Sequence, residues 1–131
     1  MIDQSLSYVI FMHSRTLEKA TPKMTRPLDE LDQTIAARAA SPSDKSYTSE
    51  LLAGGVAKIG EKITEEAAEV VEAAVEPGEA GREHLVREAG DLVYHLLVLL
   101  RQRNCSLADL EAELERRTGV SGLEEKASRK K

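Results

Sequence analysis

Apolar residues recur along most of this 131-residue chain at the spacing of amphipathic helices. No stretch after residue 25 shows the two-residue alternation of a β-strand. The pattern predicts five helical stretches, at residues 28–40, 46–54, 56–75, 80–103 and 107–119. We therefore expect an all-α protein, an antiparallel helical bundle of four to five helices.

Local signals set the ends of these helices. Ser46 is placed to cap a helix that Gly54-Gly55 breaks or kinks. Ser106 is placed to cap the last helix, with Asp109 at the capping-box position. Three leucines of that helix are expected to face inward, namely Leu107, Leu110 and Leu114. The domain is thus predicted at 26–120, after an extension at 1–25 of uncertain structure and before a polar tail at 121–131.

Carboxylates interrupt the apolar faces of the two long central helices. On a helical wheel, the apolar stripe of 56–75 contains Glu66, and that of 80–103 contains Glu88. These stripes are formed by aliphatic residues: Ile59, Ile63, Val70 and Ala74 in the first helix, and Leu85, Leu92, Leu96 and Leu99 in the second. A carboxylate on a buried face is costly unless a cation meets it. Two such positions, one on each helix, predict a site where a cation meets the carboxylates.

The spacing of the acids places them together. Glu66 stands eleven residues before Pro77 and Glu88 eleven after it, so an antiparallel pair of helices brings them level. Glu69 and Asp91 each follow three residues later, on the same faces. Oxygen ligands of this kind suit Mg²⁺ or Mn²⁺, and four or five carboxylates leave room for one ion or two. The alternative without a metal is an acidic helix face exposed to solvent. A di-iron site is disfavoured, because such sites use Glu-x-x-His and neither helix contains it.

Further residues near these acids are candidates for a phosphoanhydride hydrolysis. Glu65 is the candidate for orienting or deprotonating the attacking water. Four basic residues are candidate phosphate contacts: Lys62, Lys58, Arg101 and Arg103. Their alternative roles are helix ion pairs for the lysines and helix-dipole complements for the arginines. His95 shares the face of the second pair of acids and is expected to support the ligands from behind.

The second long helix is apolar on nearly all sides between Leu92 and Leu100. A helix of this kind is buried on several faces. In so small a domain, the additional apolar surface is best explained by self-association. A homo-oligomer is expected, either a homodimer, which is favoured, or a larger assembly.

Composition excludes several classes of function. The formal net charge of −5 and the aromatic content of 3% argue against nucleic-acid binding. No apolar run is long enough to span a membrane, and Tyr8 to Met12 is too short for a signal peptide. The single cysteine, Cys105, allows no internal disulfide and fits a reducing compartment. A cytoplasmic protein is therefore expected.

The acidic pattern resembles a known family. Glu65-Glu66-x-x-Glu69, followed by Glu88-x-x-Asp91, is similar to the signature of the MazG-type all-α nucleoside triphosphate pyrophosphohydrolases. Within that group the resemblance is to the phosphoribosyl-ATP pyrophosphatases of histidine biosynthesis. It extends over roughly residues 28–129 and includes three further motifs: Ser46-Tyr47-Thr48, Tyr94-His95-Leu96 and Ser121-Gly122-Leu123-Glu124-Glu125-Lys126.

The resemblance implies Mg²⁺-dependent cleavage of phosphoribosyl-ATP between its α and β phosphates, giving phosphoribosyl-AMP and pyrophosphate. It also implies that Glu66, Glu69, Glu88 and Asp91 hold the metal, with Glu65 in the same site. Two alternatives remain open at this point. One is a related enzyme acting on another (deoxy)nucleoside triphosphate, and the other is a non-catalytic helical interaction module.

Overall fold

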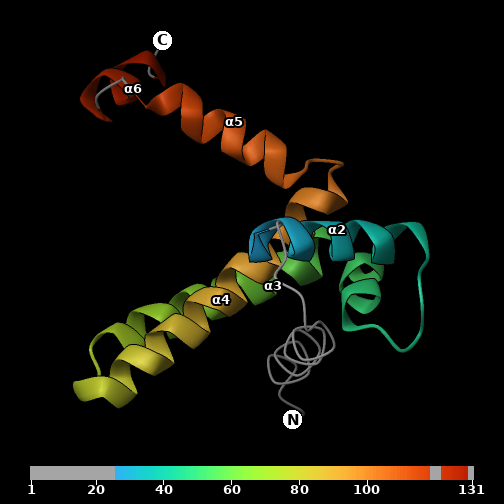
Figure 1. Cartoon of the computed structure of the whole chain (residues 1–131), viewed down its shortest axis with the longest axis horizontal. Coiled ribbons are helices and arrows are strands. Elements are labelled where there is room, and N and C mark those ends of the chain that lie inside the picture. Colours follow the sequence, from blue (N-terminus) through green and yellow to red (C-terminus); the bar gives the residue numbers. More distant parts are fainter. Residues whose placement is uncertain (1–25, 119–121, 130–131) are drawn as a thin grey trace.

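The computed structural model describes residues 26–118 and 122–129, and every regular element there is a helix. The predicted extension at 1–25 lies outside the described residues. The helices, numbered as in Figure 1, are α2 (Pro27–Ala40), α3 (Tyr47–Ala74), α4 (Gly78–Gln102), α5 (Leu107–Arg117) and α6 (Gly122–Arg129). The all-α prediction is confirmed. None of these described helices combines the length and the hydropathy that a membrane crossing requires.

The centre of the molecule is a long hairpin in which α3 and α4 run side by side (Figure 1). The chain reverses at Pro77-Gly78, where Gly78 has a φ of 76° that a side chain would disfavour. This is the turn expected between the two acidic helices. It places Glu66 and Glu88 at matching heights on neighbouring helices.

Helix α3 is kinked, as its paired glycines predicted. Ser46 caps its first turn by accepting a hydrogen bond from the Ser49 amide, and Gly55 then departs from helical geometry with φ 76° and ψ −172°. Because a left-handed φ is strained for any residue with a Cβ, glycine suits this position. The kink divides α3 into a short arm, residues 47–54, and a long segment that pairs with α4.

The hydrophobic core lies at the kinked end of the hairpin, where α2 packs against both α3 and α4. Its buried residues come from four helices: Leu31, Ile35, Leu51, Ile59, Tyr94, Leu97, Val98 and Leu107. Burying such side chains stabilises the fold by roughly 1.5–3 kcal/mol each. The acidic residues of the hairpin lie beyond this core, toward the Pro77-Gly78 turn.

The predicted apolar stripe of α4 has the wrong phase. Leu96 was expected to be buried but is 37% exposed, whereas Tyr94 and His95 are buried. The buried face of α4 is therefore rotated away from Leu96 and contains Tyr94 and His95, two aromatic residues with polar groups. The physical reason is that Tyr94 and His95 find hydrogen-bond partners on the arm of α3, so their burial is not penalised.

Helix α5 starts as predicted and continues differently. Ser106 and Asp109 form the full capping box, and Leu107 is buried. Leu114 was expected to face inward, but it is 54% exposed because α5 extends away from the hairpin (Figure 1). The segment predicted as a polar tail contains helix α6, which has no aliphatic stripe long enough to reveal it in the sequence.

Candidate active site

Three carboxylates meet between α3 and α4. One oxygen from each of Glu66, Glu69 and Glu88 lies within 4.8 Å of the others. Glu66 is only 2% exposed, while Glu69 and Glu88 are half-buried. Asp91, the fourth acid of the prediction, is buried next to this group without belonging to it, and its charge acts on both Glu66 and Glu88. We call these four residues the acidic cluster.

Two oxygens of the acidic cluster are buried without a hydrogen-bond partner, Glu66 Oε2 and Glu88 Oε2. Burial, together with the nearby Glu69 and Asp91, raises the pKa of Glu66 to about 8. The pKa of Glu88 is raised for the same reasons, burial first and Glu69 second. The described residues therefore compensate the charge of these carboxylates only in part.

Two basic side chains contact the edges of the acidic cluster. Lys62 Nζ lies 2.9 Å from Glu65 Oε2 and 3.6 Å from Glu66 Oε1. On the other helix, His84 Nε2 lies 3.2 Å from Glu88 Oε1. In Glu66 and in Glu88, one oxygen thus contacts a basic residue, and the other, Oε2, is buried without a hydrogen bond from the described residues.

His95, which was expected to support the metal ligands, is buried on α4 four residues after Asp91. Its ring is 1% exposed, and Nδ1 donates to the Asp91 carbonyl oxygen at 2.7 Å. Nε2 must then accept from the Tyr47 hydroxyl, at 2.8 Å. Burial is the main cause that lowers the pKa of His95, which keeps the ring neutral. Beside it, Thr48 and Tyr94 share a hydrogen bond of 2.6 Å that ties the arm of α3 to α4.

The other predicted residues lie at increasing distance from the acidic cluster. Glu65 is half-exposed beside Lys62. Lys58 pairs with Glu50 at 3.1 Å, on the solvent side. Arg103 is the exposed residue that ends α4. Arg101 is ten residues beyond Asp91, a distance of about 15 Å along the helix.

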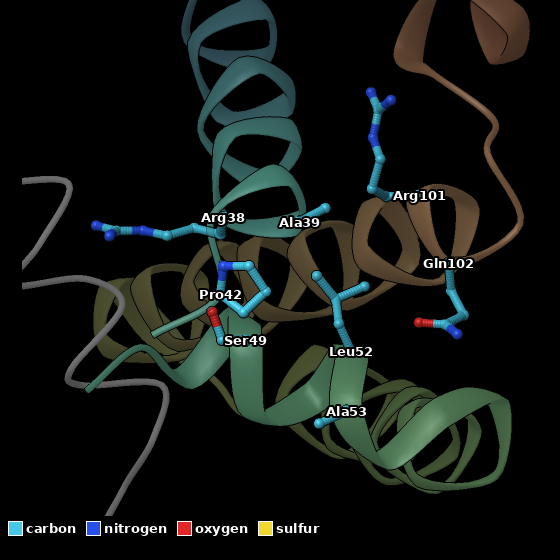
Figure 2. Close-up of a pocket in the computed structure, with 8 residues that line it drawn as sticks. All are labelled: Arg38, Ala39, Pro42, Ser49, Leu52, Ala53, Arg101 and Gln102. Carbon is cyan, nitrogen blue, oxygen red and sulfur yellow. The ribbon is translucent and has the colours of Figure 1, made fainter. Parts of the chain in front are cut away.

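Arg101 borders a cavity of about 310 Å³ at the kinked end of the hairpin. We call it the arginine cavity, because two guanidinium groups flank it; the residues around it are Arg38, Ala39, Pro42, Ser49, Leu52, Ala53, Arg101 and Gln102. In Figure 2 the side chains of Arg38 and Arg101 extend in different directions, so their charges do not converge on one point. Arg101 Nη2 instead donates to Asp32 at 3.3 Å.

Known proteins resemble the chain over the helices that carry the site. The sequence profile of the phosphoribosyl-ATP pyrophosphohydrolases matches residues 28–118. The chain belongs to this family. A phosphoribosyl-ATP pyrophosphatase of Rhodopirellula baltica is 54% identical over 108 residues, which cover 82% of this chain and 90% of the relative.

Two other members of the phosphoribosyl-ATP pyrophosphohydrolase family show the same extent of similarity. The phosphoribosyl-ATP pyrophosphatase of Dinoroseobacter shibae is 51% identical over 102 residues, covering 78% of this chain and 97% of the relative. That of Nitrobacter winogradskyi is 46% identical over 118 residues, covering 90% and 97%. The resemblance inferred from the acidic motif is thereby confirmed.

The site geometry of this family member includes contacts that sequence reasoning missed. His84 was given no role, yet it contacts Glu88. Tyr47 and Thr48 were recognised only as motif residues or capping chemistry, yet they bond His95 and Tyr94. A usable signal existed only for His84, because it precedes Glu88 by one helical turn, as Lys62 precedes Glu66.

Proposed function

We propose that the acidic cluster is the catalytic centre at which this chain hydrolyses phosphoribosyl-ATP to phosphoribosyl-AMP and pyrophosphate. Membership of the phosphoribosyl-ATP pyrophosphohydrolase family supports the reaction. The observation that carries the location is the pair of buried, unpartnered oxygens, Glu66 Oε2 and Glu88 Oε2. Such groups are costly in a folded protein and indicate a missing cationic partner.

The donor set fits a hard divalent cation, because every candidate ligand is a carboxylate oxygen. We propose that Glu66, Glu69, Glu88 and Asp91 would hold Mg²⁺, as one ion or two, and that Mn²⁺ can substitute. When bound, the ion neutralises phosphate oxygens and lowers the pKa of a coordinated water. His95 would keep Asp91 in place through the Asp91 carbonyl.

Two residues at the edge of the acidic cluster can assist the reaction, Glu65 by accepting a proton and Lys62 by offsetting phosphate charge. We propose that Glu65 accepts a proton from the water that attacks phosphorus, while the α–β anhydride bond breaks and pyrophosphate leaves. Glu65 suits this role because it is half-exposed and is held by Lys62 at 2.9 Å. Lys62 is also near enough to the cluster to contact the leaving phosphates as a point charge.

The remaining substrate contacts predicted from the sequence stay predictions. Lys58, Arg101 and Arg103 all lie outside the acidic cluster, so they can only contact parts of the substrate remote from the reacting phosphorus. The substrate is long enough to make this reasonable, since it carries a second ribose phosphate beyond its adenine.

We also propose that the chain forms a homodimer through the outer face of α4. Val86 is 72% exposed, and Val93 and Leu96 on the same side of the helix are also exposed. Several exposed aliphatic side chains on one side of a helix are consistent with an interface. Sedimentation at micromolar concentration is expected to give a dimer, and Leu96→Asp a monomer. A monomeric wild type would overturn the proposal. A cytoplasmic location is proposed too, supported by the lone cysteine.

The test of the proposed function is an assay of pyrophosphate release with a panel of nucleotides. With Mg²⁺, phosphoribosyl-ATP should give phosphoribosyl-AMP, while ATP and the canonical deoxynucleoside triphosphates should react far more slowly. Glu66→Gln should be inactive, with Glu72→Gln, an exposed acid on the same helix, as the matched control. Preference for another triphosphate would identify the related enzyme. Absence of any Mg²⁺- or Mn²⁺-dependent turnover would favour the interaction module.

A further inference from the structure

Glu66 and Glu88 of the acidic cluster each contact a basic residue one turn earlier on their own helix. Lys62, four residues before Glu66, approaches its Oε1 at 3.6 Å. His84, four residues before Glu88, contacts its Oε1 at 3.2 Å. In both glutamates Oε2 is buried without a hydrogen-bond partner among the described residues. Each carboxylate thus has one oxygen against a basic side chain and one buried oxygen that is left over.

His84 is fixed more firmly than Lys62, because both of its ring nitrogens are engaged. Nδ1 lies 2.7 Å from Glu76 Oε2, and Glu76 directly precedes the Pro77-Gly78 turn. When both carboxylates are ionised, both ring nitrogens donate to them. It cannot rotate without losing one of these bonds. The contact chain Glu76–His84–Glu88 therefore connects the turn of the hairpin to the acidic cluster.

We propose that His84 is a positioning residue that fixes the Glu88 carboxylate so that its Oε2 faces the acidic cluster. This inference rests on the proposed function, in which the cluster binds a divalent cation. Groups that hydrogen-bond to a metal ligand from outside orient that ligand, and their loss typically lowers metal affinity by roughly 10- to 100-fold. Glu76 serves as the anchor that keeps the ring in place.

The charge of His84 has the opposite effect on metal affinity, and the experiment must separate this effect from the positioning of Glu88. A protonated ring near the acidic cluster repels a divalent cation, so removing its charge by itself would tighten metal binding. Two amide variants share this loss of charge and differ only in the bond they retain. The glutamine amide nitrogen matches the position of Nε2, next to Glu88, and the asparagine nitrogen matches Nδ1, next to Glu76.

The experiment is a titration of the full chain with Mn²⁺, followed by electron paramagnetic resonance of the free ion, for wild type, His84→Gln and His84→Asn. We expect His84→Asn to bind Mn²⁺ roughly 10- to 100-fold more weakly than His84→Gln. Arg82→Ala is the matched control, since it removes only an exposed pair with Glu79 on the same helix, and it should bind like wild type. Thermal unfolding verifies that all variants fold.

Equal Mn²⁺ affinity of His84→Gln and His84→Asn would overturn the positioning role, because only His84→Gln keeps an N–H donor at the position of Nε2, next to Glu88. Failure of the proposed function has a different signature. Wild type would then bind no Mn²⁺, or binding would persist in Glu66→Gln. The two failures are thus told apart in one set of titrations.

Discussion

The acidic cluster, between α3 and α4, and the arginine cavity, whose charged side chains come from α2 and α4, both place charged side chains at poorly exposed positions, with different outcomes. Arg101 meets Asp32 at 3.3 Å, so charges of opposite sign stand together near the cavity. In the acidic cluster, three carboxylate oxygens lie within 4.8 Å of one another, and Lys62 and His84 contact only its edges. Among the described residues, the charge of Arg101 is thus paired with one of opposite sign, although its Nε is buried without a hydrogen-bond partner, while the carboxylates of the acidic cluster are compensated only in part.

We take the acidic cluster, whose charge is compensated only in part, as the candidate ligand site. We expect the Arg101–Asp32 pair to contribute to stability instead. A compensated pair is destabilising to break, because it leaves one charge behind. An uncompensated cluster is stabilising to neutralise, because its charges repel one another in a poorly solvated place. Removing a charge from each region should therefore change the free energy of unfolding in opposite directions, and only one removal should abolish activity.

The largest effect is expected for Glu66→Gln. Loss of a ligand oxygen at the centre of the acidic cluster should lower kcat by about a thousandfold or more, in the range seen when a preorganised catalytic group is removed. The same variant should be more stable than wild type without metal at pH 8, by on the order of 1–3 kcal/mol, because a buried carboxylate is gone. Urea unfolding and turnover assays measure both. A less stable variant would show that the glutamate is already compensated.

The next effect is the pH dependence of the metal-free protein. The pKa of Glu66 is raised to about 8 from an ordinary value of 4.5, so the native state binds more protons than the unfolded state between these values. Stability must then fall as pH rises from about 4.5 to 8, and the full loss is present above 8. We expect Tm to drop by several °C across this interval. Glu69, Asp91 and Lys62 face the same carboxyl and modulate the slope.

Saturating Mg²⁺ should remove most of that pH dependence, because the ion binds the deprotonated ligands of the native state. Glu66→Gln provides the internal comparison, since its metal-free Tm should change less with pH. A wild-type Tm that is flat between pH 5 and 8, without metal, would contradict the assignment of the raised pKa.

A smaller change in stability is expected for Arg101→Gln, a loss where Glu66→Gln should give a gain. Its pair with Asp32 is largely shielded from solvent, so the variant should lose about 1–2 kcal/mol of stability. Because Arg101 lies about 15 Å from Asp91 along α4, kcat should be unchanged. Steady-state kinetics with phosphoribosyl-ATP decide its other predicted role. A higher KM at constant kcat would identify a substrate contact, and an unchanged KM would remove it.

The smallest effect is expected for Lys58→Gln. Its contact with Glu50, at 3.1 Å, is exposed, and exposed pairs contribute little. Stability should change by less than about 0.5 kcal/mol, and the change should vanish in high salt. A marked rise in KM would show instead that Lys58 contacts phosphate, as the sequence suggested.

The hairpin and its acids were predictable because they depend on short-range rules. Helical periodicity, the Pro77-Gly78 turn and equal spacing from it suffice to place Glu66 level with Glu88. The caps at Ser46 and Ser106 follow from side chains that bond within one helical turn. The family was recognised from the same local pattern.

The rest depends on contacts between distant parts of the chain. The phase of α4 was misjudged because the predicted stripe followed the leucines, whereas Tyr94 and His95 are buried and bond Thr48 and Tyr47 across the hairpin. The exposure of Leu114 depends on the direction in which α5 leaves the core, which no local pattern contains. Asp91 was placed in the same group as the other acids, and its side chain lies just outside the three closest oxygens.

Gly55 connects the two parts of α3, the arm at residues 47–54 and the long segment that follows the kink. The arm before it supplies the aromatic hydroxyl that secures His95, and the long segment after it supplies Glu66 and Glu69. The backbone angle of one residue therefore sets how the capped arm is aligned with the segment that carries these two acids. A Cβ at Gly55 would meet no atom within 4 Å, so a substitution there is disfavoured by the positive φ and not by a lack of space.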